Sequence, residues 1–252
     1  MSNLVYVAVK EMVLRNDWAK SQWFRTIKIW MRLKHENIVP LLGVTDGFGS
    51  VPALVLPWLG NGALTGYLQR KHEMLSYSQK FAMLSDVARG LQYLHSESIV
   101  HGDLTGNNVL VDTNGKALLT DFSLFASLPD RISQALLPTN PGGTVCYMAP
   151  ECLTVDDEGD QTSVLSPASD VYSFGGIMLQ VVEGNVPYYY IRTQAAIINY
   201  IARGIHPRRP PTSVISDADW DFIQMCWLGD MNRRPTTKDI VAFVEGRAEV
   251  QS

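Results

Sequence analysis

Val100-His101-Gly102-Asp103-Leu104-Thr105-Gly106-Asn107-Asn108-Val109-Leu110-Val111 is the most informative stretch of this sequence. Asp103 is followed five residues later by Asn108, and apolar residues suited to a strand come directly after it. A carboxylate can orient a hydroxyl group and accept its proton, and an amide oxygen can hold Mg²⁺, a hard cation that prefers oxygen ligands. The stretch therefore indicates a metal-phosphate site, although ordinary surface loops also supply Asp and Asn at this spacing.

A second carboxylate follows ten residues on. In Leu118-Leu119-Thr120-Asp121-Phe122-Ser123, Asp121 comes directly after an apolar run that is typical of a buried strand. Taken alone, either motif is weak, and a plain loop is the better interpretation of each. The order of these and further motifs along the chain favours a functional site over a plain loop.

The ordered motifs resemble those of the protein kinase family. They cover nearly the whole chain, so coincidence is negligible. The segment before Ala149-Pro150-Glu151 looks like the Ser/Thr branch, and the C-terminal motifs are similar to those of the tyrosine-kinase-like group. The motifs are Lys10 on a Val-Ala-Val-Lys strand, His101-x-Asp103, Asn108, Asp121-Phe122, Gly143-Thr144, Tyr147-Met148-Ala149-Pro150-Glu151, Ser169–Gly175, Cys226-Trp227 and Arg233-Arg234-Pro235.

The periodicity of the chain agrees with a two-lobed fold. We expect strands over Val5–Lys10, Ile38–Val44 and Val51–Leu56, and a helix over Trp18–Lys34, where apolar residues recur at helical spacing. The rest of the chain has the starting signals of helices. These signals are Ser76-x-x-Gln79, Ser166-Pro167, Ser216-x-x-Asp219 and Thr236-x-x-Asp239, and we expect a further helix over Thr193–Ala202.

The expected fold class is α+β, with the two-lobed protein-kinase-like fold. We expect one protein kinase domain over residues 1–252. Residues 1–59 would form a small, incomplete β-rich N-lobe and the hinge, and residues 60–252 would form a large helical C-lobe.

The resemblance implies catalytic roles for Asp103, Lys10 and Asn108, and it implies ATP and Mg²⁺ as cofactors. Lys10 would bind the α- and β-phosphates of ATP. Asp103 would position the substrate hydroxyl, while Asn108 and Asp121 would hold Mg²⁺.

The resemblance also implies an adenine pocket. Ala8 and Leu110 would sandwich the adenine, Leu56 falls at the gatekeeper position, and Pro57-Trp58-Leu59 would form the hinge.

Three other residues would be structural. Glu151 would pair with Arg234, and Asp170 would hold the catalytic loop. By the same resemblance, His101 would pack against Phe122 rather than carry protons.

Five departures from the family pattern put the activity in doubt. Only nine residues precede Lys10, so we expect the two strands and the Gly-rich loop that cover ATP to be absent. Thr26 stands where the family has the Glu that pairs with this Lys. Gly102 replaces an Arg, Thr105 replaces the catalytic-loop Lys, and Ser123 replaces the Gly of Asp-Phe-Gly.

Two hypotheses for the function follow. The first is transfer of the γ-phosphate of ATP to Ser/Thr hydroxyls of a protein substrate, with activity impaired or the gene model truncated. The second is a pseudokinase, a scaffold or regulatory binding module. A third, the aminoglycoside and choline kinase relatives, shares His101-Gly102-Asp103 with a downstream Asn but lacks the Ala-Pro-Glu segment that stands here.

The composition of the chain limits the classes of partner and the cellular compartment that we expect. The net charge of −4 without a basic stripe argues against nucleic acid as a partner. The longest apolar run, Val51–Leu59, is too short to span a bilayer, so we expect no membrane partner. Cys146, Cys152 and Cys226 form no metal or disulfide pattern. We therefore expect a cytoplasmic protein whose partners are ATP and a protein substrate or regulatory partner.

Overall fold

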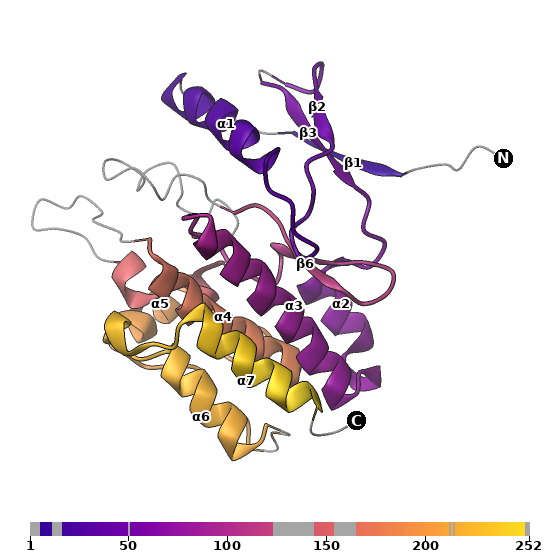
Figure 1. The fold of residues 1–252 in the computed structure, drawn as a ribbon. Helices are drawn as coiled ribbons and strands as arrows, with labels where there is room; N and C mark the ends of the chain where they lie inside the picture. The colour runs from indigo at the N-terminus through magenta and orange to yellow at the C-terminus, as the bar shows by residue number, and fades with distance from the viewer. Residues whose placement is uncertain are drawn as a thin grey trace, which may run out of the picture.

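The chain folds into a small part built on a three-stranded sheet and a larger, mainly helical part (Figure 1). The structure is a computed structural model, and it describes residues 6–11, 17–49, 51–122, 144–153, 165–211, 213 and 215–249. This arrangement of a sheet-containing lobe followed by a helical lobe confirms the predicted α+β fold class.

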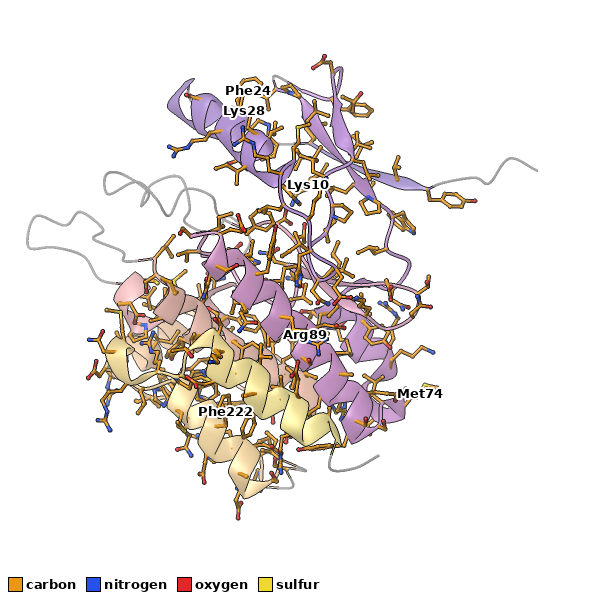
Figure 2. The ribbon with its side chains drawn as sticks, in the orientation of Figure 1. Lys10, Phe24, Lys28, Met74, Arg89 and Phe222 are labelled. Carbon is orange, nitrogen blue, oxygen red and sulfur yellow. The ribbon has the colours of Figure 1, made fainter. Side chains whose placement is uncertain are left out.

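The described residues of the small lobe form one helix and three antiparallel strands. Its elements are β1 (Val7–Lys10), α1 (Asp17–Trp30), β2 (Gly43–Thr45) and β3 (Ala53–Pro57). The strand order is β1-β3-β2, so β3 is central. In the β1–β3 register Ala8 lies opposite Leu56. This pairing places Lys10 at the end of β1, near the larger lobe, as Figure 2 shows.

Helix α1 ends at Trp30, not at Lys34 as the periodicity predicted. The last turn tightens, because the N–H of Arg32 donates to Ile29 and that of Leu33 donates to Trp30, both at i−3 spacing. The N–H of Lys34 then donates to the hydroxyl of Tyr93 at 3.0 Å instead of to the helix. A contact from the large lobe therefore fixes the end of α1.

The predicted strand over Ile38–Val44 is largely wrong. Only its end belongs to a strand, β2. Pro40 has no N–H to give to a ladder. Ile38 forms a single parallel bridge with Leu119 of the large lobe, and the N–H of Val39 donates to the carbonyl of Leu119 at 2.9 Å. The apolar run therefore fastens the two lobes together.

The large lobe holds most of the helices and a second small sheet of order β4-β5-β6. Figure 1 shows α3, α4, α6 and α7 packed side by side. The elements are β4 (Gly62–Ala63), α2 (Leu64–Lys71), η1 (His72–Met74), α3 (Tyr77–Ser96), β5 (Val109–Val111), β6 (Ala117–Leu119), η4 (Thr144–Tyr147), η5 (Pro150–Cys152), α4 (Pro167–Glu183), α5 (Gln194–Ala202), α6 (Asp217–Cys226), η6 (Met231–Arg233) and α7 (Thr237–Glu249).

The predicted capping residues begin these helices. At α3 the Ser76 hydroxyl accepts from the N–H of Gln79 at 3.2 Å, and the Gln79 side chain accepts from the N–H of Ser76 at 2.8 Å, which is a full capping box. Ser166 caps α4 with Pro167 in the first turn. Thr193, which we expected inside the helix, is instead the cap of α5. These local signals were readable because a cap needs only neighbouring residues.

Helix α4 is the centre of the large lobe. It is buried along almost its whole length, and its mainly apolar side chains meet α3 and α6. Around it, α6 and α7 are joined by Phe222 and Phe243, which stack at 3.8 Å between ring centroids. Arg89 of α3 reaches Glu245 of α7 at 2.7 Å; Figure 2 labels Arg89 and Phe222 on these helices. This packing gives the site a rigid base.

Candidate active site

The hairpin of β5 and β6 brings the candidate residues of two motifs together. Asn108 directly precedes β5, and Asp121 follows β6. The two strands are antiparallel, with Val109 opposite Leu119. The N–H of Thr120 donates to the carbonyl of Asn108 at 3.0 Å, which continues the pairing. The amide of one motif and the carboxylate of the other therefore lie at the same end of the hairpin.

Asp103 and Asn108 form one hydrogen-bonded unit. The Asn108 Nδ2 donates to the backbone carbonyl of Asp103 at 2.7 Å and to its Oδ2 at 2.8 Å. Burial raises the pKa of the Asp103 carboxyl to about 6, and the nearby charge of Asp121 also raises it, while the bond from Asn108 opposes the shift. A carboxylate with this pKa is suited to accept a proton near neutral pH.

Asp121 is held in an unusual backbone conformation. Its φ is +58°, in the left-handed region that costs a residue other than glycine about 1 to 2 kcal/mol. The Lys10 Nζ lies 2.6 Å from its Oδ2. The two side chains are 40% and 26% exposed, so their ion pair is weak enough to rearrange around a ligand. Strain of this kind points to a carboxylate that the fold holds in place for function.

The donor set fits Mg²⁺. Because the Asn108 Nδ2 is taken up by Asp103, its Oδ1 remains without a donor among the described residues and can face a cation. Asp121 supplies a carboxylate close by. Over the described parts of the chain, no group of three or more His, Cys, Asp or Glu is suited to a metal ion. Proteins often hold Mg²⁺ with one or two side chains together with substrate phosphates, and the Asn108 amide oxygen and the Asp121 carboxylate are of that kind.

The candidate adenine residues surround the junction of the lobes. Leu56 is buried at the end of β3, while Ala8 and Leu110 are partly buried and pack against the core. The Leu59 N–H has no acceptor among the described residues and can serve an adenine. In contrast, Trp58 is 62% exposed, so its side chain is not enclosed here. Its backbone N–H donates to the carbonyl of Tyr6 at 3.1 Å.

Asp170 anchors the loop that carries Asp103. This buried side chain at the start of α4 accepts from the backbone N–H of His101 and of Gly102, each at 2.8 Å. Its Oδ2 also lies 2.8 Å from the Nε2 of His95 on α3. The sequence predicted the anchoring role of Asp170 but missed His95, whose only signal was its place in the last turn of a helix.

Gly102 lies at a position where the backbone adopts a left-handed conformation. Its φ is +71°, which glycine adopts at no steric cost. We expect Gly102→Ala to lower the free energy of unfolding by about 1 to 2 kcal/mol, because a Cβ is strained in this region. Urea unfolding followed by circular dichroism measures the change.

The matched control for this change is Gly246→Ala in α7, where an added Cβ meets no atom within 4 Å. Alanine favours a helix, so this variant should be as stable as the parent or more stable. Equal stability of the Gly102→Ala variant and the parent would show that the loop readily takes another conformation.

Phe122 connects the Asp121 segment to α1 and to the catalytic loop. Its ring lies 4.9 Å from that of Trp30 and 6.3 Å from that of His101, edge to face in the second case. The Trp30 Nε1 donates to the carbonyl of Val39 at 2.7 Å. Burial lowers the pKa of His101, so its ring is neutral and acts in packing, as predicted.

Two further departures from the family pattern, Thr26 and Thr105, have visible consequences in the structure. Thr26 is buried in α1, and Lys10 pairs with Asp121 in place of a helix carboxylate. Thr105 is also buried, and its hydroxyl accepts from the N–H of Asn107 at 3.2 Å, which fixes the turn of the loop. Ser123 lies outside the described residues.

A buried polar cluster beneath the loop was not predicted. The hydroxyl of Tyr147 donates to the Gln180 Oε1 at 2.6 Å, and the Gln180 Nε2 donates to the hydroxyl of Thr65 at 3.2 Å. A Cβ at Gly106 would come within 2.4 Å of the Gln180 Oε1, so a larger residue there would have to displace the Gln180 side chain. The one sequence signal was a lone glutamine within the apolar run of α4.

An open hollow is lined in part by Asp103. Its walls are formed by the catalytic loop, by the segment around Met148 and by the start of α4, and they include Leu104, Cys152 and Leu165. The segment is fixed by Arg234, whose guanidinium holds Glu151 through two bonds of 2.5 and 2.9 Å. The exposed surface of this hollow beside Asp103 is mostly apolar.

Within the described ranges, no helix has both the length and the apolar character needed to cross a membrane.

Comparisons with known proteins agree with this geometry. A family model described as protein tyrosine and serine/threonine kinase matches residues 1–244. A Dictyostelium discoideum protein named as a probable serine/threonine-protein kinase is 30% identical over 215 residues, covering 85% of this chain and 40% of that protein. Serine/threonine-protein kinase STE20 of Candida glabrata is 28% identical over 235 residues, covering 93% of this chain and 24% of that protein.

Ephrin type-B receptor 1 of Gallus gallus is 30% identical over 244 residues, covering 94% of this chain and 23% of that protein. The chain thus spans two fifths or less of the length of these relatives. The family match covers nearly the whole chain, in the order that places Asp103, Asn108 and Asp121 around one site. The chain therefore belongs to the protein tyrosine and serine/threonine kinase family, and it is a protein kinase domain.

Proposed function

We propose that this domain transfers the γ-phosphate of ATP to a serine or threonine hydroxyl of a protein substrate. The observation that carries the proposal is the joint placement of Asp103, Asn108 and Asp121 at one end of the β5–β6 hairpin, with Lys10 2.6 Å from Asp121. The similarity to proteins named as serine/threonine kinases supports the choice of acceptor.

Each residue has a distinct task in the proposed reaction. Asp103 orients the acceptor hydroxyl and takes up its proton, helped by a pKa of about 6. Lys10 binds phosphate oxygens. Asn108 and Asp121 hold Mg²⁺, which neutralises phosphate charge when it is bound. Ala8, Leu56, Leu59 and Leu110 enclose the adenine, and the Trp58 backbone forms part of the hinge beside them. We propose that residues 1–59 and 60–252 act together as one kinase domain.

The reaction also suggests a compartment. We propose a cytoplasmic location, because ATP is abundant there and because the three cysteines, Cys146, Cys152 and Cys226, are free thiols, which reducing compartments preserve.

A thermal-shift experiment tests the nucleotide site. A ligand at 100 times its dissociation constant stabilises the folded state by about 2.7 kcal/mol. For a chain of this size that raises the melting temperature by about 5 to 10 °C. We expect this shift with MgATP for the parent chain and its loss in Asp121→Asn. Differential scanning fluorimetry provides the measurement.

Asp46→Asn is the matched control, since Asp46 is exposed in the loop after β2 and undergoes the same change of charge. This control should keep the full shift. No shift of the parent chain at millimolar MgATP would reject the ATP-dependent function and favour a pseudokinase. A shift without Asp103-dependent phosphate transfer to protein would favour a nucleotide-binding regulator.

A further inference from the structure

One face of the large lobe has a charge opposite to that of the chain. From Gly184 to Ser216 the sequence contains four arginines and no Asp, Glu or Lys, whereas the whole chain has a net charge of −4. Helix α5 lies in the middle of this stretch. In Figure 1 it lies across α4 from α2, at the edge of the lobe. We call the exposed part of this stretch the α5 surface, represented by Tyr189, Tyr190, Arg192, Ile198, Arg203 and Arg208.

Most of the arginine charge on this surface is not neutralised. Arg209 pairs with Asp217 at 2.6 Å. In contrast, Arg192, Arg203 and Arg208 are exposed, and none of them forms an ion pair with a described residue. Arg208 is partly fixed, because its backbone N–H donates to the Tyr190 hydroxyl at 3.0 Å and its guanidinium carbon lies 5.4 Å from the centre of the Tyr190 ring. The surface thus offers guanidinium groups that are available to external anions.

Apolar and aromatic groups lie among these charges. Tyr189 is 54% exposed, Tyr190 is 36% exposed and Ile198 is 40% exposed. The two tyrosine rings meet edge to face at 5.4 Å. Together with Pro207 and Pro210 they line a shallow hollow. Tyrosine and arginine are the residue types that most often dominate binding at protein interfaces.

The α5 surface is rigidly connected to the substrate side of Asp103. Beneath it, Tyr188, Ile197 and Ile201 form a separate buried cluster with Val145 of η4. The segment after η4 lines the open hollow beside Asp103. A protein segment bound on the α5 surface is thereby held close to the place where an acceptor hydroxyl must enter.

We propose that the α5 surface binds an acidic segment of a partner protein, one that combines carboxylates with an aromatic or large aliphatic side chain. The unpaired arginines select carboxylates, and guanidinium groups can bind them in bidentate fashion. The exposed rings of Tyr189 and Tyr190 pack against the apolar side chain. A nucleic acid or an anionic membrane fits less well, because Tyr189, Tyr190 and Ile198 make half of the surface apolar or aromatic and so favour a ligand that combines charge with an apolar side chain.

The test measures binding and does not depend on phosphate transfer. The probe is a fluorescent peptide of glutamate and aspartate residues with one central phenylalanine, titrated with the purified chain in fluorescence anisotropy. We expect Arg192→Glu combined with Arg203→Glu to weaken binding about tenfold or more, since each change replaces attraction by repulsion. Raising the salt concentration should also weaken binding by the parent chain.

The matched control reverses two arginines elsewhere. Arg25 and Arg32 are exposed on and just after α1 and form no ion pair with a described residue. Arg25→Glu with Arg32→Glu changes the net charge by the same amount and should leave the affinity within about twofold. A third variant, Tyr189→Ala, should weaken binding of this peptide but not of a peptide without its phenylalanine. Circular dichroism melting confirms that each variant is folded.

Several results would overturn the proposal. One is no binding of the acidic peptide, and another is an equal loss in the α1 control. Tighter binding of a single-stranded oligonucleotide or of phosphatidylserine vesicles would assign the surface to those ligands instead. Binding that occurs only after Asp156, Asp157, Glu158 and Asp160 are replaced by Asn or Gln would identify the chain's own acidic stretch as the occupant.

Discussion

The Asp103→Asn variant is expected to transfer phosphate to protein about 10²- to 10⁴-fold more slowly than the parent chain, because it loses its general base. Its amide retains an oxygen that can accept the bond from Asn108, so the loop should keep its shape. MgATP should still raise the melting temperature of the variant, since Asp121 and Asn108 remain. Radiolabelled phosphate transfer to a general protein substrate measures the rate.

The same variant should be more stable than the parent at neutral pH. The pKa of Asp103 is raised to about 6 in the folded chain, from the ordinary value of 3.8 for a solvated carboxyl. The folded state therefore binds the proton more tightly, and its stability falls as the pH rises from about 4 to about 6. A shift of this size corresponds to about 1 to 3 kcal/mol, which an uncharged Asn removes.

Measuring the free energy of unfolding at pH 7 and at pH 4 therefore tests the burial of the Asp103 carboxyl independently of its role in phosphate transfer. The advantage of Asp103→Asn over the parent should be present at pH 7 and absent at pH 4. An Asp103→Asn variant with full transferase activity would remove Asp103 from the proposed mechanism. A variant that is less stable than the parent at pH 7 would contradict the buried environment of this carboxyl.

Asp170→Ala is expected to be the most destabilising single change in the catalytic core. It leaves the backbone N–H groups of His101 and Gly102 without an acceptor, and each orphaned donor costs about 1 to 3 kcal/mol. It also removes the partner of His95. We expect a loss of about 3 to 5 kcal/mol in the free energy of unfolding. Denaturant unfolding at neutral pH measures it.

Two companion variants make this result specific. Asp170→Asn keeps one acceptor oxygen and should lose less stability than Asp170→Ala. Asp221→Ala, at an exposed position on α6, should change stability by less than about 0.5 kcal/mol. If Asp170→Ala unfolded at the same denaturant concentration as Asp221→Ala, the anchoring of the catalytic loop would have to come from other contacts.

The helices of the large lobe could be predicted because their signals are local. Ser76 with Gln79 and Ser166 with Pro167 each mark a helix start with residues that touch only their neighbours. The ends of elements in the small lobe were predicted less well. Contacts from the large lobe set them, as the Tyr93 hydroxyl does at Lys34 and as Leu119 does at Ile38 and Val39.

The roles of the candidate residues followed from resemblance, and their mutual geometry did not. Sequence order placed Asp103, Asn108 and Asp121 in one family pattern. It did not predict that Lys10 pairs with Asp121, because that contact joins a strand of the small lobe to a loop of the large one. Nor did it predict the Tyr147–Gln180–Thr65 cluster, whose members are far apart in the chain.

The sequence by itself thus determined the family, the α+β class and the chemical types of the groups at the site. Each motif and each helix cap involves residues that are close together in the sequence, so it can be recognised without the tertiary structure. Only the tertiary structure decided the proton affinity of Asp103, the strained backbone of Asp121 and the unpaired arginines of the α5 surface. Burial, backbone strain and unneutralised charge depend on which distant segments pack together, and no local pattern specifies that packing.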